Sequence, residues 1–300
     1  MKIVVAGGTG LLGRAITTAL LDAGHQVTAT SRSNPASDPI DSRALWASAD
    51  VTVPGTLPAA VQGADAVVDA VQFPNSPIEN PRKGFTFERI DLGGTRNLVD
   101  AARAAGVRHF IGLSGVGASA DARYHWQRFK WEEEQYIAAS GVPFTVFRPS
   151  WIYGERDVSL NRFLGFTRFL PFVPVIGNGR ARINPLYIGD LGAHVAAAVA
   201  KGNPTGQVFE IGGPETLTMD EVIRCALQVA GKRRFLLHNP VFVMKAVASL
   251  VQFAPGRPLT PGAIDFITMD GVADNTNLTA SFGLPLTPLR DGLSRYLLKS

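Results

Sequence analysis

The stretch that most constrains this chain is its beginning, MKIVVAGGTGLLGR. Residues 3–6 are apolar with no polar alternation, which predicts a buried strand. Gly7, Gly10 and Gly13 follow at G-x-x-G-x-x-G spacing, and apolar residues then recur at helical intervals over residues 11–21. Three glycines between a strand and a helix predict an α/β fold with a dinucleotide site at its first turn.

Each glycine of this turn has its own task. Gly7 can turn sharply out of the strand, Gly10 lets a pyrophosphate approach the backbone, and Gly13 lets the helix lie close to the sheet. The helix N-terminus offers unpaired N–H groups and partial positive charge to phosphates. We therefore assign cofactor contacts in this turn to Gly7, Thr9, Gly10, Leu11, Leu12 and Gly13.

Composition excludes several classes of protein. The chain has 300 residues, of which 46% are hydrophobic and 18% charged, as expected of a well-buried globule. Its single cysteine, Cys225, forms no intrachain disulfide and is expected to fill core space. The net charge of +4 is spread along the chain and does not favour nucleic acid. With no signal-peptide pattern and no long apolar run, we expect a cytoplasmic protein without a membrane span.

The first half alternates short apolar strands with helical patterns, which predicts a Rossmann-type, doubly wound parallel sheet. After residue 153 the texture becomes rich in Gly, Pro, Phe and Arg. We therefore expect a dinucleotide-binding domain at 1–153 and a smaller, mostly helical substrate-side region at 154–300, interleaved with the sheet. The expected strands are 25–29, 45–47, 66–70, 109–113, 144–147 and 208–211, and the expected helices include 85–105, 124–140 and 189–200.

Local signals in the second half predict individual turns and caps. Gly177-Asn178-Gly179 between two apolar pairs predicts a hairpin. Thr218 with Glu221 predicts a capping box, and Thr287-Pro288 an N-cap followed by a first-turn proline.

Residues 241–253 form an unusual segment. They are apolar almost all round, apart from a narrow stripe of Lys245, Ser249 and Gln252, and the basic run 232–234 precedes them. One interpretation is a helix buried against the substrate side. The other is a contact for a partner protein or a membrane surface.

The residues after the second strand bear on which nucleotide binds. NAD-binding sites place an acid there, about 20 residues past the glycines. This chain has Thr30, Ser31 and Arg32, and no carboxylate before Asp38. Arg32 would pair with a 2′-phosphate, and Arg14 would add a second cation, so we predict NADP(H), with NAD(H) less favoured.

Asp50, followed by Val51, ends the expected third strand. Its carboxylate is placed either to accept a hydrogen bond from the adenine amino group or to cap a turn, and the residues alone favour neither.

A wider set of motifs occurs in a fixed order: GGTGLLG at 7–13, Asp50-Val51, Thr95-Arg96-Asn97, LSGVGA at 113–118, Lys130, and RPSWIYG at 148–154. Together they resemble the extended, atypical short-chain dehydrogenase/reductase superfamily. The segments 169–199 and 212–223 look like the branch that includes the NADPH-binding accessory subunit of respiratory complex I and its bacterial relatives. NmrA-like proteins are the next nearest.

The resemblance implies catalytic roles for Ser114 and Lys130. In this superfamily a Tyr-x-x-x-Lys pair serves proton transfer, because the lysine holds the nicotinamide ribose and lowers the tyrosine pKa, while a serine orients the carbonyl. Here Trp126 stands at the tyrosine position, and indole has no acid–base chemistry at neutral pH. Tyr124 is two residues earlier and is rotated roughly 200° about the helix.

Three alternatives for the proton therefore stay open. Ser114 and Lys130 bind cofactor without turnover, or Lys130 is itself the donor, as the resemblance to isoflavone-reductase-like proteins implies. Otherwise another group serves, the candidates being Tyr153, Tyr187, Tyr124 and His125.

The expected site is completed by the ends of later strands. Backbone after the sixth strand is expected, by resemblance, to touch the nicotinamide amide. Arg156, Arg180 and Arg182 follow and are candidates to receive an anionic substrate. The further residues assigned to the cofactor are Ala70, Val71, Ser114, Lys130, Pro149, Ser150 and Trp151, and no metal is expected.

Two functions are consistent with these observations. The first is an NADP(H)-dependent oxidoreductase that reduces a small carbonyl or enone. The second, favoured by Trp126, is a non-catalytic NADPH-binding protein with a structural, assembly or redox-sensing role.

Overall fold

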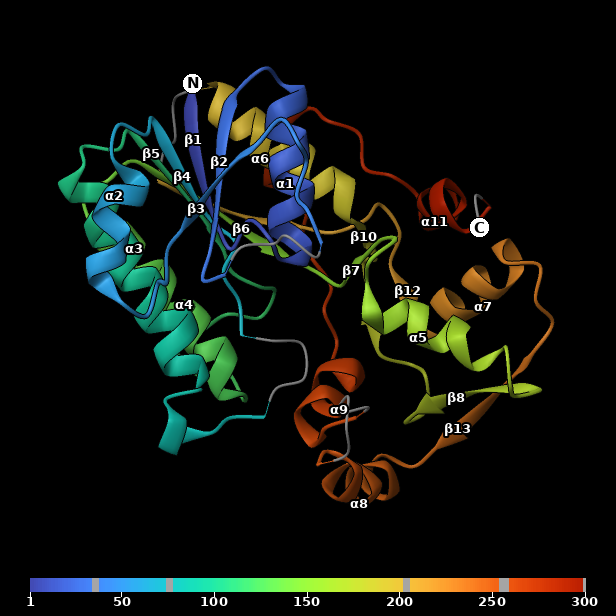
Figure 1. The fold of residues 1–300 in the computed structure, drawn as a ribbon. Helices are drawn as coiled ribbons and strands as arrows, with labels where there is room; N and C mark the ends of the chain where they lie inside the picture. Colours follow the sequence, from blue (N-terminus) through green and yellow to red (C-terminus); the bar gives the residue numbers. More distant parts are fainter. Residues whose placement is uncertain (34–37, 74–77, 202–205, 254–258, 299–300) are drawn as a thin grey trace.

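The structure, a computed structural model, describes residues 1–33, 38–73, 78–201, 206–253 and 259–298. Its centre is a parallel sheet of seven strands in the order β11-β6-β5-β4-β1-β2-β3 (Figure 1). This confirms the predicted doubly wound Rossmann-type fold. The strands of the sheet are β1 (Lys2–Ala6), β2 (Gln26–Ser31), β3 (Leu45–Ser48), β4 (Ala66–Asp69), β5 (His109–Leu113), β6 (Phe144–Pro149) and β11 (Gln207–Ile211).

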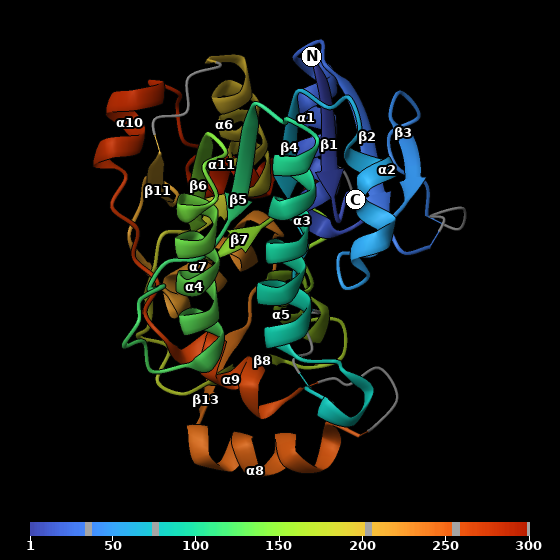
Figure 2. The same cartoon turned by 90° about the vertical axis from the view of Figure 1, so that its left-hand side faces the viewer.

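Helices cover both faces of the sheet. On one face, α1 (Leu11–Asp22) packs against α6 (Ile188–Lys201), and Ile16 and Leu191 are buried there with no exposed surface. On the other, α2 (Leu57–Val61), α3 (Gly93–Ala104) and α4 (His125–Ala139) cover a second core (Figure 2). Strands buried on both faces explain the continuous apolar runs in the sequence.

The expected helix at 85–105 begins about two residues later and is not α-helical in its first turn. Phe85 instead bridges back to Asn80, after the short helix η2 (Pro81–Lys83). The chain then makes a π-helical turn, η3 (Glu88–Leu92), before α3 begins. Single π turns often occur at functional sites, and this one carries Asp91, whose carboxylate accepts a hydrogen bond of 3.0 Å from the Phe73 amide.

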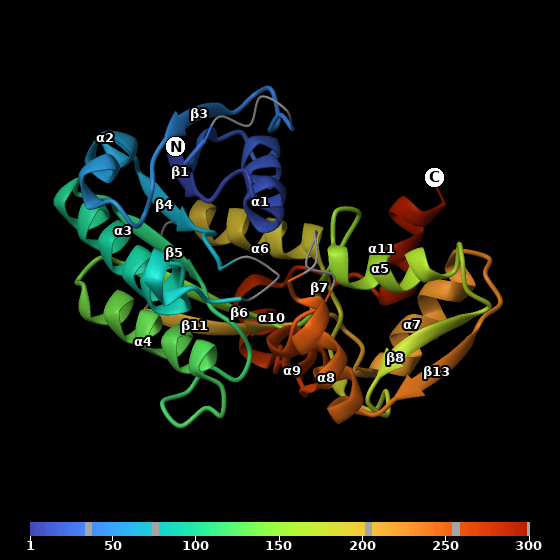
Figure 3. The same ribbon diagram turned by 60° about the horizontal axis from the view of Figure 1, so that its bottom comes forward.

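The second half builds a smaller lobe beyond α6, which Figures 1 and 3 both place away from α2, α3 and α4. It has its own core, in which Tyr153 and Val222 are fully buried. β11 and α10, by contrast, return to the central sheet. The remaining elements are η1 (Pro54–Thr56), β7 (Ile152–Tyr153), α5 (Val158–Phe166), β8 (Phe172–Ile176), β9 (Arg182–Ile183), β10 (Leu186–Tyr187), β12 (Leu217–Thr218), α7 (Met219–Val229), β13 (Phe235–Asn239), α8 (Val241–Val251), α9 (Pro261–Thr268), α10 (Thr276–Phe282) and α11 (Leu289–Leu297).

The predicted hairpin around Gly177-Asn178-Gly179 is wrong. The turn exists, with positive φ at both glycines, but its flanking strands do not pair with each other. β8 pairs in parallel with β13, and β9 pairs antiparallel with β12. The turn therefore connects the two-stranded sheet of β8 and β13 to that of β9 and β12.

The two predicted caps have different outcomes. Thr218 and Glu221 form the capping box at the start of α7, as predicted. Thr287 is not an N-cap: Pro288 holds that position in α11, because the Thr287 amide and hydroxyl both donate to the Asp190 carboxylate.

α8 lies at the periphery of the molecule, beyond α9 (Figure 1). Ala248 is its only buried residue, whereas Phe242 and Leu250 are 76% and 79% exposed. The interpretation of this segment as a buried helix is therefore wrong, because α8 packs through a narrow strip alone, against α9 and Ile176. Among the described residues, no helix has the length and apolar character needed to cross a bilayer.

Candidate functional site

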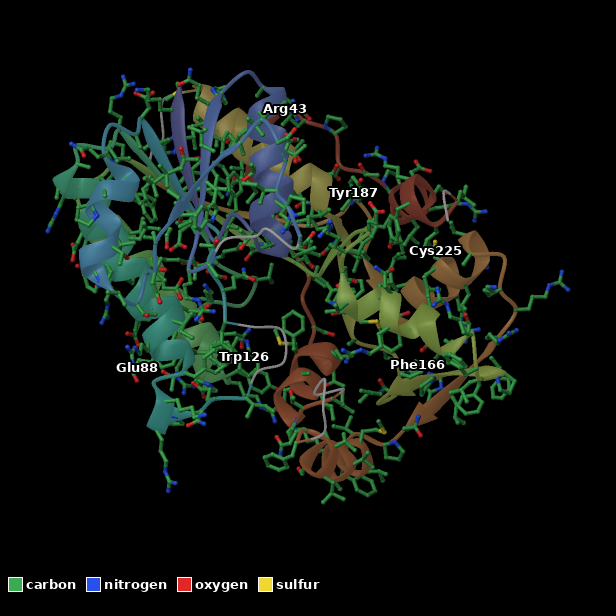
Figure 4. All side chains as sticks on the ribbon, viewed as in Figure 1. Arg43, Glu88, Trp126, Phe166, Tyr187 and Cys225 are labelled. Carbon is green, nitrogen blue, oxygen red and sulfur yellow. The ribbon has the colours of Figure 1, made fainter. Side chains whose placement is uncertain are left out.

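A cavity of about 860 Å³ lies at the carboxyl ends of the sheet strands, where α/β folds bind ligands. The segments that follow β1 to β6 form one wall. Residues of α5, α8 and α9 form the opposite wall. In Figure 4, the labelled Trp126 and Phe166, which both line this cavity, mark the α4 side and the α5 side.

The glycine turn has the geometry that a pyrophosphate cradle requires. Gly7 has φ of 73°, and a Cβ on Gly13 would lie 2.2 Å from the Gly7 carbonyl oxygen, so neither position accepts a side chain. A Cβ on Gly10 would meet only that same oxygen, at 3.2 Å. Gly10 also caps α1 without a side-chain bond, and no acid occupies the first turn. The helix N-terminus is therefore suited to an anion.

The structure brings nearly all of the predicted site residues to this one cavity. Gly13 is the exception, because it packs beneath the turn, against Gly7 and Gly8. The predicted residues that line the cavity are Gly7, Thr9, Gly10, Leu11, Leu12, Ser31, Arg32, Asp50, Val51, Ala70, Val71, Ser114, Lys130, Pro149, Ser150 and Trp151.

Arg32 lines the cavity with an exposed side chain. Arg14 does not line it, because its guanidinium donates to the carbonyls of Thr9, at 2.8 Å, and Pro39, at 2.7 Å, and pairs with Asp38. The expectation that Arg14 adds a second cation is therefore wrong. Asp38 also pairs with Arg156 at 2.8 Å, and that hydrogen bond holds the pKa of Asp38 below its usual value.

Asp50 caps a turn, as one of the two interpretations predicted. Its Oδ1 accepts hydrogen bonds from the Thr52 amide at 2.8 Å and the Thr52 hydroxyl at 2.7 Å. The next residue, Val51, accepts a 2.8 Å bond from the Asn97 side chain, which ties the Thr-Arg-Asn motif to this turn. The adenine contact of Asp50 stays a prediction.

Ser114 and Lys130 both line the cavity. Ser114 follows β5, and its buried Oγ has no hydrogen-bond partner among the described residues. Lys130 on α4 directs its Nζ to Glu133 Oε2 at 2.9 Å and to Asp91 Oδ1 at 3.2 Å. Because an ammonium group has three donors, one remains for a ligand.

Trp126 faces the cavity, where its ring stacks on Tyr124 with centroids 4.3 Å apart. The Tyr124 hydroxyl instead donates to Asp265 of α9 at 3.3 Å, which fits the predicted rotation. Of the four alternative proton donors, His125 alone is among the described residues that line the cavity, and its Nε2 lies 3.0 Å from Glu79 Oε2.

Sequence reasoning missed a buried acidic cluster around Lys130. Asp69, Asp91 and Glu133 are each at most 4% exposed. Burial raises the pKa of all three carboxyl groups. Burial alone would lower the pKa of Lys130, but the carboxylates of Glu133 and Asp91 raise it above its usual value. The only local signal was Glu133, three residues after Lys130 and hence on the same helix face.

The wall opposite the sheet is largely apolar and was also missed. Arg156, Arg180 and Arg182 do not line the cavity, contrary to their predicted role as an anion receptor; Arg162 does line it. The apolar residues on this side include Val158, Phe163, Phe166, Met244, Leu259, Phe266, Ile267 and Met269, and the aromatic residues Phe73, Phe85, Phe87 and Trp126 line the same cavity.

Comparison with solved structures shows the fold. The whole chain superposes on a UDP-glucuronic acid 4-epimerase from Bacillus cereus solved with NAD, with a TM-score of 0.78, covering 100% of this chain and 99% of that one at 18% identity. A UDP-glucose 4-epimerase from Thermotoga maritima gives a TM-score of 0.77 at 18% identity, again over 100% and 99% of the two chains.

Sequence relatives are more varied in their named roles. The photosystem II assembly factor Ycf39 of Trieres chinensis is 24% identical, over 84% of this chain and 76% of that protein. Subunit 9 of the NADH dehydrogenase 1 alpha subcomplex of Arabidopsis thaliana is 26% identical, over 82% and 62%. A 3 beta-hydroxysteroid dehydrogenase/isomerase of Mycobacterium tuberculosis is 28% identical, over 77% and 70%.

These relatives confirm the resemblance to extended, atypical short-chain dehydrogenases/reductases. A family model described as NAD(P)H-binding matches residues 7–164, which include the glycine turn, Ser114 and Lys130. The chain therefore belongs to this NAD(P)H-binding family and binds a nicotinamide dinucleotide.

Proposed function

We propose that this protein is an NADP(H)-dependent oxidoreductase that reduces an apolar carbonyl or enone. The observation that carries the proposal is one cavity lined by the glycine turn, by Ser114, whose hydroxyl has no partner in the described part of the chain, and by a wall of apolar side chains. When bound, the dinucleotide supplies a hydride. The protein supplies binding, orientation and the exclusion of water.

The described side chains suit these tasks. The N–H groups at the start of α1 hold phosphate, and the remaining donor of Lys130 holds ribose hydroxyls. The Ser114 hydroxyl donates to the substrate carbonyl oxygen, since no described residue competes for it. Phe166, Phe266 and Ile267 favour a substrate with an apolar body.

The preference for NADP(H) rests on the segment after β2. Arg32 lies at the cavity and is available to a 2′-phosphate. The first carboxylate after it, Asp38, is neutralised by Arg14 and Arg156. The two arginines therefore offset the repulsion that the Asp38 carboxylate would exert on a 2′-phosphate.

The experiment is stopped-flow oxidation of bound NADPH against a panel of apolar enones and ketones, with small hydrophilic carbonyls for comparison. We expect turnover with the apolar members and a loss of about 100-fold in Ser114→Ala, the scale of one oxyanion donor. The matched control is Ser249→Ala, whose hydroxyl bonds a backbone carbonyl on exposed α8. Bound NADPH that no carbonyl oxidises would overturn the catalytic assignment.

A second candidate, a non-catalytic NADPH-binding protein with an assembly role, is favoured by α8. Phe242, Leu250 and Phe253 are each more than 75% exposed, and Lys232 and Arg233 are exposed nearby. Such a helix fits a partner protein or an anionic membrane surface. The test compares Phe242→Asp with wild type in sedimentation with anionic vesicles and in analytical ultracentrifugation. A cytoplasmic location stays a prediction, which cell fractionation checks.

A further inference from the structure

We propose that Asp69, Asp91 and Glu133, gathered around Lys130, store one proton and release it when positive charge appears in the adjacent cavity. This inference rests on the proposed function, in which the cavity holds a nicotinamide dinucleotide. It assigns the role of proton source to this cluster, because Trp126 stands where the superfamily has its proton-donating tyrosine.

The cluster is assembled from four separate elements. Asp69 ends β4, Asp91 lies in η3, Thr95 in α3, and Lys130 and Glu133 in α4. Lys130 Nζ contacts Glu133 and Asp91, and Thr95 Oγ1 lies 2.8 Å from Asp69 Oδ2 and 3.3 Å from Glu133 Oε2. The hydroxyl of Thr95 has one proton for two carboxyl groups. A protonated carboxyl group satisfies the second contact.

Charge balance also requires a stored proton. Three carboxyl groups, each at least 96% buried, face one ammonium group, and a further carboxylate, Glu79, acts on Asp91 with the same negative sign. With all three ionised, the cluster would carry two uncompensated negative charges away from water, which is strongly unfavourable. Burial accordingly raises the pKa of all three carboxyl groups.

Two residues of the cluster, Lys130 and Asp91, connect it to the cavity. Ser114 Oγ and Glu133 Oε1 are buried and have no hydrogen-bond partner among the described residues. Lys130 and Asp91 both line the cavity, whereas Glu133 lies behind Lys130. Lys130 Nζ can therefore hand a proton outward and regain one from Glu133 Oε2.

The coupling follows from electrostatics. Oxidised nicotinamide carries a positive charge that the reduced ring lacks, and a nearby positive charge favours ionised carboxylates. A carbonyl that has accepted a hydride at carbon takes the proton at oxygen and becomes an alcohol, and the cluster is reprotonated from water. The proton is thus released when the nicotinamide is oxidised, which is when the reduced substrate oxygen requires a proton.

The experiment is isothermal titration calorimetry of the full chain with NADP⁺ and with NADPH, near pH 7, in buffers of different ionisation enthalpy. The buffer dependence gives the number of protons released on binding. We expect NADP⁺ to release more than NADPH, by up to about one proton. The 2′-phosphate titrates in both ligands, so its contribution cancels. Equal proton numbers would overturn the inference and leave the proposed function standing, whereas binding of neither ligand would overturn both.

Glu133→Gln is expected to reduce the difference toward zero while both ligands still bind. The matched control is Glu132→Gln, one residue earlier on α4, where the carboxylate is exposed and pairs with Arg96. That variant should keep the wild-type difference. If Glu133→Gln keeps it too, Glu133 is not the store. The comparison of NADP⁺ with NADPH on the wild-type protein tests the inference by itself, so it remains decisive even if a variant fails to fold.

Discussion

The wall of the cavity formed by the sheet carries the glycine turn, Ser114 and Lys130 among apolar residues, whereas the wall formed by α5, α8 and α9 presents mostly apolar side chains. On the first wall, Gly7 and Gly13 admit no Cβ, and Lys130 is fixed by two ion pairs. On the second, Phe266 is 48% exposed and α8 buries a single residue. The comparison teaches that binding of the dinucleotide is built into the fold, while the substrate wall can vary without disturbing it.

The largest expected effect comes from breaking the sheet wall at Gly13. In Gly13→Val, the Cβ would meet the Gly7 carbonyl oxygen at 2.2 Å, so α1 must move off the turn. We expect a loss of about 3 kcal/mol in unfolding free energy, together with loss of NADPH binding. Thermal denaturation and calorimetry measure the two. Gly165→Ala on α5, where a Cβ meets nothing within 4 Å, is the control and should lower neither.

On the apolar wall, a buried charge should weaken binding of the substrate without changing binding of the cofactor. Phe166→Asp places a carboxylate in the cavity, and we expect binding of an apolar ligand to weaken at least about tenfold. NADPH affinity should not change. Phe169→Asp, at a side chain that is 86% exposed, is the control. Competition with an environment-sensitive apolar dye gives the affinity for the apolar ligand. An equal effect of both variants would show that the apolar wall does not bind the ligand.

A smaller effect is expected at the edge of the sheet wall, at Arg32. NADPH should bind more tightly than NADH, and Arg32→Ala should reduce this preference about tenfold by removing a charge-assisted hydrogen bond. Arg43→Ala removes an exposed arginine that pairs with Asp22 and Asp41, and it should leave the preference intact. Equal affinities in wild type would rule out the NADP(H) assignment.

The smallest effect concerns pH. Burial raises the pKa of Glu133 above its ordinary value of 4.5, so above that value the folded protein binds more protons than the unfolded chain. The contribution of Glu133 to stability therefore falls as pH rises from about 4.5 upward. Glu133→Gln removes this pH-dependent contribution. We expect the fall in unfolding free energy with rising pH to become smaller by about 1 kcal/mol, as measured by urea unfolding at a series of pH values. Glu132→Gln should follow the wild-type curve.

Sequence patterns were sufficient where a signal is local. The glycine spacing, the buried strands and the capping box at Thr218 depend on residues close in the chain, and the structure confirms them. The acidic cluster could not be seen because Asp69, Asp91 and Lys130 meet only through the fold. The hairpin at 177–179 was wrong for the same reason, since β8 finds its partner in the distant β13.

The edge strand of the central sheet has a consequence for synthesis. β11 pairs with β6 over residues 207–211 and takes the edge position, where α10 packs against it. Until these residues have left the ribosome, β6 presents an open row of amide and carbonyl groups to any other extended chain. More than 50 residues separate β6 from β11, so a fragment that ends at 153 should aggregate more readily than the full chain.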